Sequence, residues 1–118
     1  MAIPSRLMGS GLGSQAANNI CGDVAAGLTA TGSSASDALQ LSAVNVQMST
    51  VSSSTGVKLP PAEAGAVVLI RNSGLQTLTI YPQSGSTIDG SASTTIATAR
   101  GILLMATSNT TWFTLKGA

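Results

Sequence analysis

Few residue types in this chain could do chemistry. Histidine is absent, which removes the most common general base and the imidazole ligand of most transition-metal sites. The acidic residues are Asp23, Asp37, Glu63 and Asp89, and each is isolated in sequence. Two of these carboxylates could hydrolyse a glycosidic bond if folding brought them together. We instead expect the acids in turns, with Asp89 bonding its own backbone, and we predict that the protein is not an enzyme.

The other chemically suggestive features also have simpler explanations. Cys21 is the single cysteine, so it cannot form an internal disulfide, and without a histidine partner we interpret it as an inert thiol. The sequence GSGLGS at residues 9–14 looks like a phosphate cradle. It lacks the sixth-position glycine of a dinucleotide fingerprint and the Gly-Lys-Ser/Thr of a Walker loop. The sequence therefore predicts no catalytic residue, no cofactor and no metal ligand.

The composition excludes several classes of partner. Only 8% of the residues are charged, against about 25% in an average chain, whereas 43% are hydrophobic. A net charge of +1 provides no basic patch for nucleic acid or for an anionic membrane surface. No apolar run approaches the ~20 residues of a transmembrane helix. We expect neither nucleic acid nor a membrane as a partner, and we expect synthesis in a reducing compartment.

The elements that carry these residues fall into two parts. Residues 1–22 are rich in glycine and poor in bulky side chains, so we expect a flexible N-terminal arm. Ile3, Leu7 and Met8 are its candidate anchors. Residues 23–118 form the second part, a single β domain.

The pattern of the second part is typical of short strands. In VNVQMST (residues 44–50) the side chains of Val44, Val46 and Met48 alternate with polar ones, which indicates a half-buried strand. Later β-branched runs follow at roughly 8–12-residue spacing, separated by turn signals. The stretch 36–41 fits a helical turn or a strand equally well. We predict an all-β fold, a small antiparallel β-sandwich or jelly roll with an extended N-terminal arm.

Two of these strands are apolar on both faces. The first contains Val67, Val68, Leu69 and Ile70, and the second contains Ile102, Leu103, Leu104 and Met105. Successive side chains of a strand point to opposite faces, and a small sandwich buries only one of them. A second subunit, or else the arm or a loop, must therefore cover the other face. The adjacent Trp112 and Phe113 should likewise divide between the core and an interface.

Residues 56–112 carry a resemblance to a known module. The series TGVKLPPAEAGAVVLIRNSG, then QTLTIYPQSGSTIDG, and finally ATSNTTW resembles a recurrent domain of tailed-phage virion proteins. In that domain a Leu-Pro and an acidic-Ala-Gly turn precede a valine-rich strand and a Tyr-Pro strand. The upstream LTATGSSASDALQLSA is similar to the segment that commonly precedes it. These motifs set turns and packing rather than chemistry.

The resemblance implies a structural role. The chain most resembles the trimeric jelly-roll decoration proteins, or cement proteins, of tailed-phage heads. A member of that family would be made in the bacterial host cytoplasm and lie on the outer capsid surface of the virion. It would form a homotrimer and clamp neighbouring copies of the major capsid protein. The alternative is a knob or fibre-type virion protein, on a head fibre or tail, that binds a host-surface receptor or glycan.

Overall fold

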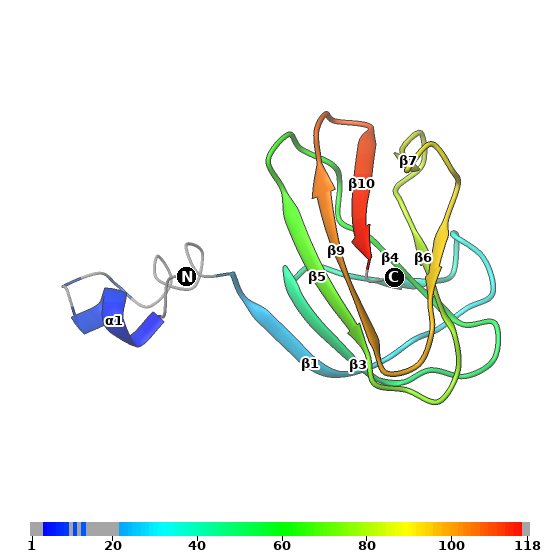
Figure 1. Ribbon diagram of the computed structural model, residues 1–118, viewed down its shortest axis with the longest axis horizontal. Coiled ribbons are helices and arrows are strands. Elements are labelled where there is room, and N and C mark those ends of the chain that lie inside the picture. The colour runs from blue at the N-terminus through cyan, green and yellow to red at the C-terminus, as the bar shows by residue number, and fades with distance from the viewer. Residues whose placement is uncertain (1–3, 10, 12, 14–21, 117–118) are drawn as a thin grey trace.

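The computed structural model describes residues 4–9, 11, 13 and 22–116, and its main body consists of two β-sheets packed face to face (Figure 1). The sheets have the strand orders β1-β3-β5-β9-β10-β7 and β2-β4-β6-β8. The larger sheet contains β1 (Val24–Thr29), β3 (Asn45–Thr50), β5 (Val67–Asn72), β9 (Arg100–Ala106), β10 (Thr111–Lys116) and β7 (Thr87–Ile88). The smaller sheet contains β2 (Leu39–Gln40), β4 (Gly56–Lys58), β6 (Leu78–Tyr81) and β8 (Thr94–Ile96). The prediction of an all-β fold is therefore confirmed.

The prediction of an antiparallel sandwich or jelly roll is wrong. From β1 to β6 the chain alternates between the two sheets, so that β1, β3 and β5 are parallel neighbours, and so are β2, β4 and β6. Five of the eight strand ladders in the described residues are parallel. The chain thus winds as a coil that resembles a β-solenoid, and the antiparallel ladders among the described strands all involve β8 or β9.

The hydrophobic core fills the space between the sheets. Alternate residues of β3 and β5 point into it, as the period of two predicts. β1 lacks this alternation, because its register against β3 shifts within the strand. Val46 and Met48 of β3 are buried, while Gln47 and Ser49 between and beyond them are exposed. The largest fully buried side chain belongs to Trp112.

The sequence left open whether residues 36–41 form a helical turn or a strand, and the structure shows which parts are which. Residues 34–38 form a turn, in which the Ala38 N–H donates to the Ser34 carbonyl at 3.1 Å, and a short strand, β2, follows. Leu39 and Leu41 both pack against the core. The strand interpretation is therefore correct for Leu39–Gln40, whereas residues 36 and 37 lie in the turn.

A helix lies in the described section of the predicted arm. This helix, α1 (Pro4–Gly9), has six residues, and the sequence analysis did not predict it. Its proline stands in the first turn, where a missing N–H costs nothing. No helix among the described residues is long and apolar enough to cross a membrane.

A buried amide fixes the connection between β5 and β6. Asn72 is fully buried, and its Nδ2 donates to the carbonyls of Gln76 at 2.8 Å and Ile96 at 3.2 Å. Its Oδ1 accepts from the Gly74 N–H at 3.0 Å. One side chain therefore ties the end of β5 to the following turn and to β8.

Candidate functional site

The outer face of the larger sheet carries two apolar rows that cross three adjacent strands. In the first row Met105 of β9 lies between Val67 of β5 and Phe113 of β10. In the second row Leu103 of β9 lies between Leu69 and Leu115 of the same two strands. We call these side chains the apolar grid. Its members are Val67, Leu69, Leu103, Met105, Phe113 and Leu115.

The described part of the chain leaves this grid open to solvent. Leu103 is half-buried, and the remaining members are exposed by 40% (Val67), 46% (Leu69), 46% (Met105), 49% (Phe113) and 69% (Leu115). With roughly 200 Å² for a fully exposed large side chain, these fractions correspond to about 500 Å² of apolar surface. This approaches the upper end of the ~300–600 Å² patch that a monomer typically exposes.

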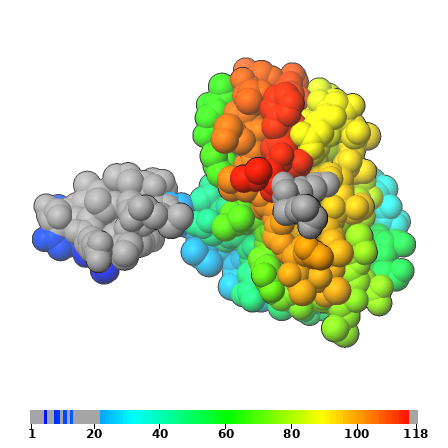
Figure 2. Space-filling view, viewed as in Figure 1, coloured from blue at the N-terminus to red at the C-terminus, as the bar shows by residue number. Residues whose placement is uncertain are grey.

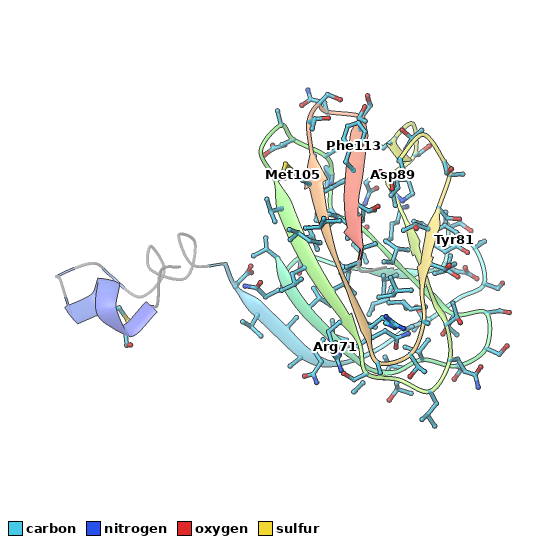
Figure 3. All side chains as sticks on the ribbon, in the orientation of Figure 1. Arg71, Tyr81, Asp89, Met105 and Phe113 are labelled. Carbon is cyan, nitrogen blue, oxygen red and sulfur yellow. The ribbon has the colours of Figure 1, made fainter. Side chains whose placement is uncertain are left out.

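Polar residues bound the grid along the strands and beside them. Near the end of β5 the exposed Arg71 lies opposite Gly101 of β9 on one side and opposite Gln47 of β3 on the other, in the register of the strands. Figure 3 shows Met105 and Phe113 close together near one end of the sheet and Arg71 at the opposite end. Figure 2 shows β9 and β10 side by side at the surface of the molecule. The grid is thus an uncharged patch with a cation at one end.

The structure divides the predicted site residues between two environments. Val68, Ile70, Ile102 and Leu104 are buried in the core, and Val67, Leu69, Leu103 and Met105 belong to the grid. The prediction that both strands present apolar side chains to two faces is therefore confirmed. Trp112 and Phe113 also separate as predicted, because Trp112 is fully buried and Phe113 is exposed.

Sequence reasoning missed one member of the grid. Leu115 is the most exposed of the six, and the analysis did not single it out. The alternation of TWFTLK contains the signal, since Phe113 and Leu115 are two residues apart and must share a face.

The predicted anchors of the arm lie largely beyond the structural description. Ile3 lies outside the described residues, and of Leu7 only the backbone, in α1, is described. Met8 is exposed by 42%. Contact of these residues with a capsid stays a prediction.

The three aspartates hold turns and strand ends. Asp23 accepts a hydrogen bond from the Val44 N–H at 3.1 Å. Asp89 accepts from the N–H of Thr114 at 3.1 Å and from its hydroxyl. The expectation that Asp89 bonds its own local backbone through its side chain is therefore wrong, because the carboxylate bridges from the turn after β7 to β10.

Asp37 organises the turn before β2. Its Oδ1 accepts from the Ser34 N–H at 2.9 Å, the Ser33 N–H at 3.0 Å and the Ser34 hydroxyl at 3.1 Å. The Ser34 N–H, followed by the Ser33 N–H and the Ser34 hydroxyl, lowers the pKa of Asp37 below its ordinary value, because these donors favour the carboxylate. Gly32 must stay small, since a Cβ there would lie 2.3 Å from the Asp37 carbonyl oxygen.

Comparison with known proteins adds no relative. No family model matches the chain, and neither the curated proteins nor the solved structures contain a significant match. Among the described residues, no group of three or more Cys, Asp or Glu side chains is arranged to hold a metal ion.

Proposed function

We propose that this protein is a non-catalytic structural module that assembles through the apolar grid into a homotrimer and cements a phage capsid. The observation that supports the proposal best is the grid itself. Its two rows form a continuous apolar surface over β5, β9 and β10, with no charged member. A patch near the upper end of the range for monomers is often functional, and self-association would cover it.

Further copies of the same chain are the occupants that suit this surface. A stable interface buries about 800 Å² on each partner, and the grid contributes about 500 Å² of apolar area to it by the exposed fractions above. The polar rim at Gln47 and Arg71 lies where an interface commonly becomes solvent-accessible. In a trimer each copy meets two neighbours, so the grid would lie against the symmetry axis and be covered from both sides.

Attachment to a shell would then use surfaces away from the grid. The predicted anchors Ile3, Leu7 and Met8 precede the β domain in sequence. Three arms on one trimer bind as a unit, because each bound arm raises the effective concentration of the others. This multiplication allows weak individual contacts to clamp neighbouring capsid subunits. The resemblance of residues 56–112 to phage virion domains supports the outer capsid as the location.

The second candidate is a knob or fibre-type virion protein that binds a host receptor or glycan. A depression on the smaller sheet favours it, with a mixed polar and apolar lining that includes Lys58 and the turn that contains Ser84. In this function the trimer would display three such depressions away from its axis.

A low-resolution reconstruction of the virus particle that encodes this chain separates these functions. The proposal expects threefold density on the outer capsid surface that fits three copies of the β domain. Density only at the tip of a fibre or tail would support the second candidate instead. Purified particles that lack the chain would contradict both.

A further inference from the structure

The smaller sheet carries a depression that the proposed assembly does not use. It has a volume of about 370 Å³ and lies over β4 and the turn that follows β6. Small-molecule sites span about 300–1,000 Å³. The polar residues that line it are Lys58, Gln83, Ser36, Ser84 and Ser86, with Pro82 among the apolar ones.

A network of amide hydrogen bonds holds one wall of the depression in place. The Gln83 Nε2 donates to the Gln40 Oε1 at 2.8 Å and to the Leu59 carbonyl at 2.7 Å. The Gln40 Nε2 in turn donates to the same carbonyl at 3.1 Å. Both N–H donors of Gln83 are therefore engaged, and its Oε1 accepts no hydrogen bond from the described residues.

The rim of the depression is a tight turn. The Ser86 N–H donates to the Gln83 carbonyl at 2.9 Å, and Gly85 has a φ of 86°. A turn with a left-handed third residue favours glycine at that position. Ser84 and Gly85 are exposed at its tip, and Ser86 is half-buried.

Lys58 supplies a cation without an internal partner. Its register partner on β6 is Tyr81. The ring of Tyr81 lies over Gly56, where an added Cβ would be 2.8 Å from Cε2. The Tyr81 side chain therefore extends along the sheet toward Gly56. Lys58 is half-buried, and it forms no ion pair with the described residues.

The chemistry of the lining selects a class of ligand. One ammonium group binds one negative charge, and the hydroxyls of Ser84 and Ser86 with the Gln83 Oε1 suit ligand hydroxyls. The Ser36 hydroxyl already shares a hydrogen bond of 2.9 Å with the Ser34 hydroxyl. Neither a carboxylate nor an aromatic ring is among the described residues of the lining, so the depression offers no stacking surface for a nucleobase. We propose that it binds an acidic saccharide, a sugar that carries a single carboxylate.

This inference deepens the second candidate function, which rests on the same depression, and it does not depend on the proposed assembly through the apolar grid. The depression belongs to the smaller sheet, whereas the apolar grid lies on the outer face of the larger one. A protein that fails to trimerise can therefore still bind the sugar, and a trimer that ignores the sugar leaves the assembly proposal intact.

Titration of the full ¹⁵N-labelled chain by NMR tests the inference, with D-glucuronate as the acidic sugar. We expect concentration-dependent shifts in the amide signals of Ser84, Gly85 and Ser86. D-glucose has the same ring without the carboxylate, and we expect it to bind at least tenfold more weakly, which corresponds to about 1.4 kcal/mol. Inorganic phosphate is the third titrant. Shifts with phosphate as large as those with glucuronate would reveal a simple anion site and overturn the sugar assignment.

Two variants connect the binding to the depression. We expect Lys58→Gln to weaken glucuronate binding at least tenfold, and Ser84→Glu, at the exposed rim, to weaken it by charge repulsion. The matched control is Arg71→Gln, which removes a cation from the other sheet and should leave the affinity unchanged. The inference is overturned if glucuronate shifts no amide of the turn, if glucose binds equally well, or if both depression variants bind like the unchanged protein.

Discussion

At the scale of single residues, three polar side chains stabilise the connections of the coil. Asn72 connects three backbone groups in the interior, Asp37 closes the turn before β2, and Asp89 joins the end of β7 to β10. Their types could be predicted from the sequence as turn-forming, but their partners could not. The Asp89–Thr114 bond spans 25 positions of the chain, and only the tertiary fold brings these residues together.

We expect Asn72→Ala to lower the free energy of unfolding by about 2–4 kcal/mol, because it leaves buried N–H and C=O groups without partners. Denaturant unfolding at fixed protein concentration measures this, with the fluorescence of the single, fully buried Trp112 as the signal. Gln76→Ala is the matched control, since Gln76 is exposed and contributes its backbone carbonyl to the network. Equal stability of the two variants would contradict the role assigned to Asn72.

The turn around Asp37 should loosen in acid. Because the pKa of Asp37 is lowered in the folded protein, its contribution to stability is present above the ordinary value of 3.8 and is lost as the pH falls through the folded value. We expect the amide signals of Ser33 and Ser34 to shift together with a midpoint below 3.8. The variant Asp37→Asn should abolish this transition. A midpoint at or above the ordinary value would show that these hydrogen bonds do not favour the carboxylate.

At the scale of elements, the alternation of side chains predicts which face of a strand is buried, but it does not predict the order of the strands in the sheets. The faces of β3, β5 and β9 could be predicted residue by residue, because alternation fixes which side chains enter the core. The parallel coil could not. The spacing of strands along the sequence is the same whether the next strand pairs with the one before it or crosses to the other sheet. Only the crossover places β1, β3 and β5 side by side.

The two faces of β5 should respond oppositely to the same substitution. We expect Val68→Asp to unfold the chain, since an unpaired carboxylate in the core costs several kcal/mol, comparable to the total stability of about 5–15 kcal/mol. We expect Leu69→Asp to leave a folded monomer, because Leu69 is 46% exposed on the grid. Circular dichroism and light scattering distinguish these states. If both variants remained folded trimers, the division of β5 into a core face and an interface face would be wrong.

At the scale of the whole molecule, the two outer faces differ in character. The larger sheet presents the apolar grid, and the smaller sheet presents the depression beside Lys58. The sequence predicts the first of these from its doubly apolar strands. It does not predict the second, because Lys58, Ser36 and Ser84 are far apart in the chain and of ordinary types. The described surface therefore combines one face suited to self-association with another suited to a polar ligand.

The central claim is that copies of this chain cover the apolar grid of one another. Light scattering coupled to size-exclusion chromatography, at micromolar concentration, tests it most directly. We expect the unchanged protein to have three times the mass of one chain. We expect the double variant, which carries both Phe113→Ser and Leu115→Ser, to have the mass of one chain and an unchanged Trp112 emission. The control Gln47→Ser, beside the grid, should stay trimeric. The account would be contradicted if the unchanged protein had the mass of a single chain, or if the double variant at Phe113 and Leu115 remained a trimer.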